Sequence, residues 1–100
     1  MPAIKQAMDN HFQISLHLTT PSGFETFGTF ELGKDREQAL AIFSELKGTP
    51  EIAKNSILYM VFSEIQAGIP LPIEMMHCTL DELAFNARVI TREVFKNLSL

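Results

Sequence analysis

The chain has 100 residues, of which 46% are hydrophobic and 20% are charged, and its formal net charge is -4. This length allows one domain with a single core, which would bury roughly 65% of the surface that the unfolded chain exposes. The acidic balance leaves no general basic field for phosphates, and no apolar stretch approaches the roughly 20 residues that span a bilayer, so we expect neither a nucleic-acid nor a membrane partner.

The first strand is predicted for residues His11–Thr20, where apolar and polar side chains alternate with the period of two that is typical of a half-buried strand. Residues 1–10 are interpreted as an N-terminal arm and residues 11–100 as a single domain. Pro21 and Gly23 predict a tight turn after this strand. The chain should therefore form a hairpin.

The returning strand is predicted for residues 24–32, and Gly28 within it indicates a β-bulge. A helix is then expected over residues 35–47, with Asp35 as its N-cap and Gln38 in capping-box spacing. Gly48 is expected as the residue that ends this helix. A single helical turn is predicted from Thr49 to Asn55.

The third strand, residues 57–62, is apolar at odd and even positions alike, which predicts burial on both faces or coverage by something outside the first core. A second turn is expected at residues 66–68, followed by a fourth strand over residues 69–79. Pro70 and Pro72 cannot donate backbone hydrogen bonds, which predicts that this strand lies at an edge of the sheet or enters the sheet late.

The second helix should begin after Thr79, which forms a capping box with Glu82. Phe85 and Val89 are placed on the side of this helix that faces away from the core, with the cations Arg88, Arg92 and Lys96. The predicted core side is the broad apolar arc of Leu80, Leu83, Ala84, Ala87, Ile90, Val94, Phe95 and Leu98.

These elements predict an α+β fold, a two-layer ββαββα sandwich with a four-stranded, mainly antiparallel sheet and two helices on one face. A right-handed crossover between the two halves favours the strand order 2-1-3-4. The order of elements assigns no activity, because function depends on sites and not on folds.

The single cysteine, Cys78, excludes an intramolecular disulfide, and the first ten residues lack the apolar segment of a secretory signal. Both observations favour the cytoplasm. A thiol near a helix start can be nucleophilic, but the neighbouring His77 should point to the opposite face of the strand. A buried, inert Cys78 is the favoured interpretation.

No metal and no cofactor are expected. His11 and His17 share a strand face but their Cα atoms should lie roughly 20 Å apart, too far for one ion. The sequence has no phosphate-binding glycine loop and no familiar hydrolase motif. The carboxylates on the strands give no reason to prefer catalysis to solvation, so an enzyme is not the favoured interpretation.

The leading hypothesis is a non-enzymatic homodimer or small interaction module. The third and fourth strands hold more apolar side chains than two helices can cover, and large exposed apolar patches usually mark interfaces. Its predicted interface consists of Phe27, Tyr59, Val61, Met75, Met76, Phe85 and Val89.

Two alternatives remain open. In a small-molecule binding protein or a minor enzyme, the sheet face away from the helices could form a cup lined by His11, His17 and His77 with Phe27. Cys78 is a further candidate for such a pocket. The cationic side of the second helix, with Phe85 and Val89, could instead dock an acidic partner protein.

Overall fold

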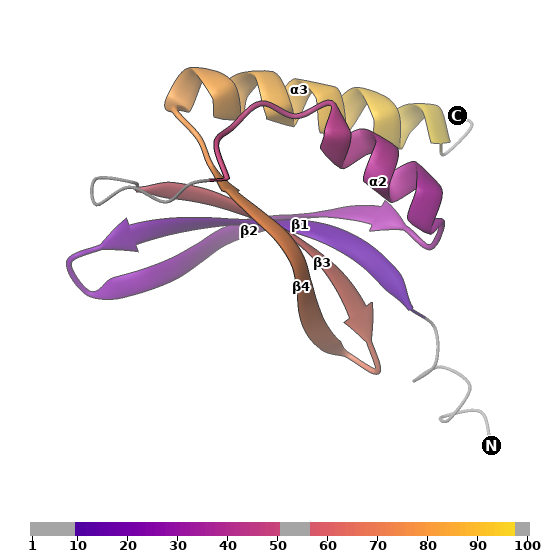
Figure 1. Ribbon diagram of the computed structural model, residues 1–100, viewed down its shortest axis with the longest axis horizontal. Coiled ribbons are helices and arrows are strands. Elements are labelled where there is room, and N and C mark those ends of the chain that lie inside the picture. Colours follow the sequence, from indigo (N-terminus) through magenta and orange to yellow (C-terminus); the bar gives the residue numbers. More distant parts are fainter. Residues whose placement is uncertain (1–9, 51–56, 98–100) are drawn as a thin grey trace.

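The computed structural model describes residues 10–50 and 57–97, and its elements follow one another in the order ββαββα (Figure 1). All strand pairs are antiparallel, and the strands are ordered β2-β1-β3-β4 across the sheet. The predicted fold class and strand order are confirmed. The elements are β1 (His11–Thr20), β2 (Gly23–Gly33), α2 (Arg36–Ser44), β3 (Leu58–Gln66), β4 (Ile69–His77) and α3 (Leu80–Asn97).

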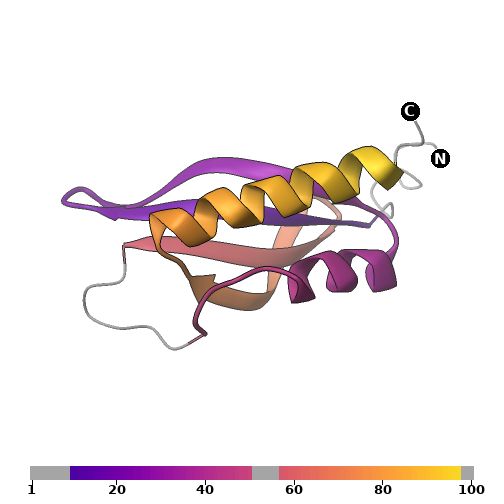
Figure 2. The same cartoon turned by 90° about the horizontal axis from the view of Figure 1, so that it is seen from above.

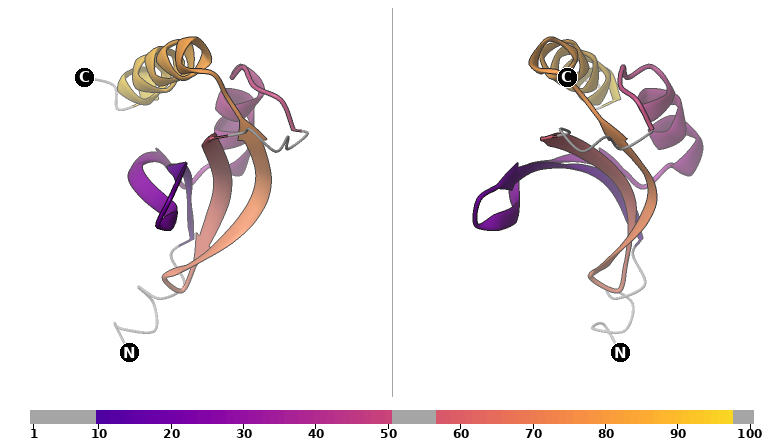
Figure 3. Two further views of the ribbon diagram at one scale, coloured as in Figure 1. Left: turned by 90° about the vertical axis from the view of Figure 1, so that its left-hand side faces the viewer. Right: turned by 60° about the vertical axis from the view of Figure 1, so that its left-hand side comes forward.

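The helices form one layer and the sheet forms the other. Figure 2 shows α3 running lengthwise over the sheet with the shorter α2 beside it. In Figure 3 both helices lie on the same side of a strongly twisted and bent sheet, so neither described helix covers its other face. We call that other face the open face.

The core lies between the two layers. Alternate residues of β1 and β3, among them Ile14, Met60 and Phe62, point toward the helices and are fully buried. Ile90 of α3 and Phe43 of α2 close the core from above, and the rings of Phe43 and Phe62 stack with centroids 5.1 Å apart. Alternate residues of a strand point to the same face of the sheet, so the period-two pattern of β1 predicts this placement of its apolar side chains in the core.

Turn and bulge positions follow the local sequence signals. Ala67 and Gly68 join β3 to β4 with φ angles of 52° and 80°, the two left-handed residues that a tight hairpin turn requires. The register of β1 against β2 shifts between Leu16 and His17, so Phe27 is the extra residue of a bulge beside Gly28. The proline-containing β4 is an edge strand, as predicted.

The helix α2 ends three residues earlier than predicted. Asp35 caps its start by accepting a hydrogen bond from the Gln38 backbone N–H at 3.3 Å, but the helix stops at Ser44. Beyond it, the side chain of Asn86 accepts a hydrogen bond from the Lys47 N–H at 2.7 Å and donates one to the Lys47 carbonyl at 2.8 Å. These two bonds replace the helical hydrogen bonds that Lys47 would have made.

Gly48 is therefore not a helix-ending residue with a left-handed backbone. It lies where the chain passes close to β4, and a Cβ atom there would be 2.5 Å from Met76 Sδ and 2.9 Å from the His77 carbonyl oxygen. The next residue, Thr49, pairs with His77 as an isolated β-bridge. Glycine is needed at this position because the two backbones approach closely.

The helix α3 begins as predicted but is rotated about its axis. Thr79 and Glu82 form the reciprocal capping box, with N···O distances of 2.9 and 3.1 Å. Asn86 and Val89 are buried, whereas Leu80 and Phe95, which were predicted to be core residues, are exposed. The prediction for these positions was wrong because the Asn86 contacts with Lys47 turn the helix away from its most apolar side.

Three predictions lie outside the described residues: the N-terminal arm, most of the helical turn expected after Thr49, and the core position predicted for Leu98. Among the described residues, no helix is both long enough and apolar enough to cross a membrane.

Candidate functional site

The open face is polar on one half and apolar on the other. Across the sheet, Thr29 of β2, Ser15 of β1, Val61 of β3 and Met75 of β4 lie in one row. The neighbouring rows follow this division only in part: β1 and β2 contribute mainly polar groups, but Ser63 of β3 and His77 of β4 are polar as well. The apolar half consists of Tyr59, Val61, Ile65, Pro70, Pro72 and Met75.

The bend of the sheet makes this face concave. Phe24 of edge strand β2 reaches over β1, and its ring centroid is 5.2 Å from that of Tyr59 on β3. The face contains a hollow of about 380 Å³, and no Asp, Glu, Lys or Arg is among the described residues that line it. The lining residues are Gln13, Ser15, His17, Phe24, Thr26, Thr29, Val61, Ser63, Pro70, Pro72 and Met75.

The imidazole of His17 is held from several sides. Its Nε2 is 2.8 Å from the Ser15 hydroxyl and its Nδ1 is 2.9 Å from the Thr26 hydroxyl, while the ring of Phe24 stacks on it with centroids 4.9 Å apart. The Ser15 hydroxyl also donates to the Val61 carbonyl at 3.5 Å. This network assigns the proton to Nε2, with Nδ1 accepting from Thr26.

Burial lowers the pKa of His17 below its ordinary value of 6.5. The ring is therefore neutral at neutral pH, and both of its nitrogens are already engaged. His17 is better suited to fixing the wall of the hollow than to transferring protons.

Three polar side chains in the hollow make no hydrogen bond within the described part of the chain: Gln13, Thr29 and Ser63. Gln13 and Ser63 are register partners on β1 and β3. Ser63 is only 2% exposed, yet no fully buried side-chain nitrogen or oxygen atom among the described residues lacks a partner. The Ser63 hydroxyl must therefore open onto the hollow.

Several residues that were predicted to form the interface are buried in the structure. Tyr59 and Val61 are buried within the single chain because the flanking strands bend over β3, and Met76 is buried in the core under the helices. Met75 and Phe27 are 39% and 58% exposed, but Phe27 lies at the bulge and does not line the hollow.

The four residues predicted for a ligand pocket are not brought together in one place: His77 and Cys78 line a second hollow, which His11 and His17 do not reach. His11 lies near one end of β1, where its Nε2 is 3.2 Å from Glu31 Oε1. His17 and His77 flank Tyr59 in one row of the open face, and only His17 lines the hollow. Among the described residues, no three His, Cys, Asp or Glu side chains lie close enough to hold a metal ion.

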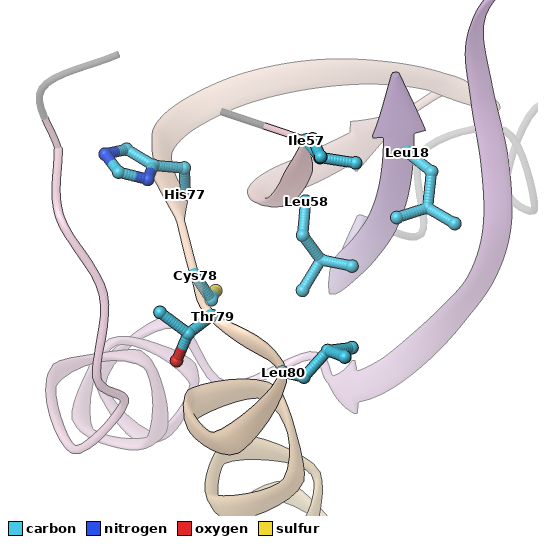
Figure 4. Close-up of a pocket in the computed structure, with 7 residues that line it drawn as sticks. All are labelled: Leu18, Ile57, Leu58, His77, Cys78, Thr79 and Leu80. Carbon is cyan, nitrogen blue, oxygen red and sulfur yellow. The ribbon is translucent and has the colours of Figure 1, made fainter. Parts of the chain in front are cut away.

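A second hollow, of about 450 Å³, lies beside the start of α3. Figure 4 shows Leu18, Leu58 and Leu80 turned toward it with the sulfur of Cys78, while the His77 ring points away. Burial and the nearby Glu82 carboxylate raise the pKa of Cys78 to about 11, although a weak contact from Asn86 acts in the opposite direction. The thiol is protonated at neutral pH, as expected for an inert cysteine.

The rotation of α3 leaves a mainly apolar strip on its solvent side, in which every residue except Thr91 was predicted to be a core residue. Leu80 and Phe95 at its ends are 76% and 58% exposed, and the smaller side chains between them are exposed or half-buried. We call this strip the α3 stripe. It consists of Leu80, Ala84, Ala87, Thr91 and Phe95.

The strip predicted to dock an acidic partner also differs from the prediction. Val89 is buried, and Lys47 Nζ lies 4.3 Å from the centroid of the half-buried Phe85 ring. Arg92 and Lys96 contact Glu93 at 3.1 and 3.7 Å. These ion pairs reduce the positive charge that an acidic partner would meet.

Comparison of the chain with protein-family models, with curated protein sequences and with solved structures found no match.

Proposed function

We propose that the protein is a non-enzymatic interaction module that forms a homodimer through the α3 stripe. The observation that carries this proposal is the exposure of Leu80 and Phe95 at the two ends of one apolar helix face. Water contact with such a face is unfavourable, and a second copy would remove it from solvent. The neutral, engaged His17 and the protonated Cys78 support a role other than catalysis.

The stripe is suited to pairing with itself in the antiparallel direction. A two-fold axis between Ala87 and Arg88 would place Leu80 against Phe95 of the second copy and Ala84 against its Thr91. The small side chains in the middle allow the two helices to approach closely, and the large ones cover the ends. The contact would be about 22 Å long at a rise of 1.5 Å per residue.

The charges beside the stripe support the same direction. On a helical wheel Asp81 and Arg92 lie on one side of the stripe, so an antiparallel pair brings Asp81 near Arg92 of the second copy. Arg88 would lie beside its own symmetry mate, which opposes association. The contact is short, and the repulsion between the two Arg88 side chains offsets part of the attraction between Asp81 and Arg92. We therefore expect a weak dimer with a dissociation constant in the micromolar range.

The open face is the second candidate interface, since it was the one favoured by the sequence. Phe24 and Met75 remain 54% and 39% exposed there. Because the Ser15, His17 and Thr26 side chains satisfy one another, covering them would cost little in lost hydrogen bonds. A concave face would, however, leave an unfilled space against a second concave face.

Sedimentation equilibrium tests both candidates. We expect Ala84→Glu to weaken the dimer at least tenfold, because a carboxylate would be buried in the contact. The control Ala41→Glu makes the same change at an exposed position of α2 and should leave association unchanged. Arg88→Gln should strengthen the dimer by removing the repulsion across the axis.

A matched pair on β4 separates the two faces. Met75→Glu alters the open face, whereas Leu71→Glu alters a similarly exposed residue on the opposite side of the same strand. A monomeric wild-type chain at 100 micromolar or so would contradict self-association. A dimer sensitive to Met75→Glu but not to Ala84→Glu would move the interface to the open face.

We also propose that the protein works in the cytoplasm, since its one thiol has no cysteine to pair with and stays reduced there. Cell fractionation tests this location.

A further inference from the structure

We propose that the hollow in the open face binds a small uncharged molecule that carries an amide group, such as a primary or cyclic carboxamide on a ring. This site is separate from the α3 stripe, which lies on the helix layer at the other side of the sheet. A dimer through α3 would leave one such hollow accessible on each copy.

The size and walls of the hollow suit a single ring with one substituent. Its volume of about 380 Å³ is at the lower end of the range for small-molecule sites. One side is apolar, formed by Val61, Met75 and Pro72, and the ring of Phe24 stands at the rim. Flat apolar surfaces of this kind pack well against a planar ring.

The unpaired polar groups indicate which substituent the ring should carry. The side-chain amide of Gln13 offers both a hydrogen-bond donor and an acceptor. Ser63 is the register partner of Gln13, and its hydroxyl can also donate or accept a hydrogen bond. Thr29 adds a second hydroxyl. A ligand amide presents a donor beside an acceptor in the same way, so it can satisfy groups that the protein leaves without partners.

The absence of charge in the lining excludes other classes of ligand. The described residues around the hollow include no Lys or Arg for a carboxylate or phosphate, and no Asp or Glu for an amine. His17 cannot take the role of an anion-binding cation at neutral pH, because it is neutral and both of its nitrogens are engaged. An ion would lose its hydration without compensation.

The wall of the hollow is fixed before any ligand binds. His17 is held by two hydroxyls and by the stacked Phe24 ring, and Ser15 is tied to the β3 backbone at Val61. A rigid wall lowers the ordering cost of binding. The concave form therefore belongs to the free protein.

Three probes of similar size test the chemistry: benzamide, benzoate and toluene. Benzamide and benzoate are titrated into the full chain to about 10 mM, the range in which weak ligands are detected, and toluene is titrated to its solubility limit in water, which is lower. Binding is followed by backbone amide chemical shifts. We expect benzamide to shift residues that line the hollow and to bind at least tenfold more tightly than benzoate. Toluene, which has no polar group, should bind more weakly than benzamide.

A variant tests the role of Gln13, one of the polar side chains that line the hollow. Gln13→Leu should weaken benzamide binding about tenfold without weakening toluene binding, whereas the control Gln66→Leu, at an exposed position of β3, should change neither. The wild-type comparison of benzamide with benzoate does not depend on whether Gln13→Leu folds.

Three outcomes would overturn the proposal: no shifts in the hollow with benzamide, equal or tighter binding of benzoate, or shifts confined to other surfaces. None of them bears on the α3 dimer. Conversely, a protein that is monomeric but binds benzamide in the hollow would support this binding site and contradict the proposed homodimer.

Discussion

Replacing Asn86 by Leu should destabilise the fold more than any exposed substitution. Asn86 has no exposed surface, and its side chain makes two hydrogen bonds to the backbone of Lys47 and a weaker one to Met60 Sδ. Leucine has a similar size but leaves the Lys47 N–H and carbonyl without these partners. At about 1–3 kcal/mol for each of these two unsatisfied groups, the expected loss is about 2–6 kcal/mol.

Urea denaturation followed by circular dichroism measures this loss, with an unchanged dependence on urea as evidence that both variants unfold alike. The control is Asn10→Leu, the same change at an exposed residue whose contact with Glu64 is long, at 3.5 Å. A loss below about 1 kcal/mol for Asn86→Leu would refute the account of how α3 is oriented.

Three further predictions concern single residues. Ala67→Asn should stabilise the protein by about 0.5–1 kcal/mol, because asparagine tolerates the left-handed backbone that alanine adopts here with φ of 52°; a lower urea midpoint would contradict this. The His17 pKa is lowered, so the folded chain binds fewer protons than the unfolded chain, and the His17 contribution to stability is present above pH 6.5 and lost as the pH falls below it. Proton NMR titration should give a His17 midpoint below 6.5, and His17→Gln should reduce the acid sensitivity of unfolding; a midpoint above 6.5 would contradict the assignment. Because its pKa is raised to about 11, Cys78 should react with iodoacetamide at pH 8 far more slowly in the folded chain than in urea, and equal rates would show an accessible thiolate.

The sequence predicted the features that depend on neighbouring residues. Alternation of side chains identified β1, the proline positions placed β4 at an edge, and the Asp35 and Thr79 caps marked where both helices begin. These signals are local, because a cap or a turn needs only the few residues beside it.

The features that were missed depend on contacts between distant residues. The end of α2 and the rotation of α3 both follow from Asn86 binding the backbone of Lys47, 39 residues away in the chain. A polar residue within a helix is usually read as solvent-exposed, so nothing beside Asn86 identified it as a core residue. The clue was indirect: Val89, three positions further on, was apolar on the side assigned to solvent.

The errors in the predicted sites follow from these errors in the predicted fold. Because α3 was placed with its apolar arc inward, the α3 stripe was assigned to the core and the surplus of apolar residues was assigned to the open face. The bend of the sheet has no signal in the alternation of side chains, although the apolar residues at both odd and even positions of β3 did predict the burial on both faces that is observed for Tyr59 and Val61. The hollow was anticipated as a cup, but only His17 of its predicted histidines lines it.

We propose that the helix layer, and not the open face, meets a second copy of the chain. A dilution series of the 100-residue chain, followed by backbone amide chemical shifts, tests this proposal without any substitution. The account predicts concentration-dependent shifts along Leu80, Ala84, Ala87, Thr91 and Phe95, with the residues of the hollow unchanged. Shifts at Phe24 and Met75 with an unchanged α3, or spectra that do not depend on concentration, would contradict it.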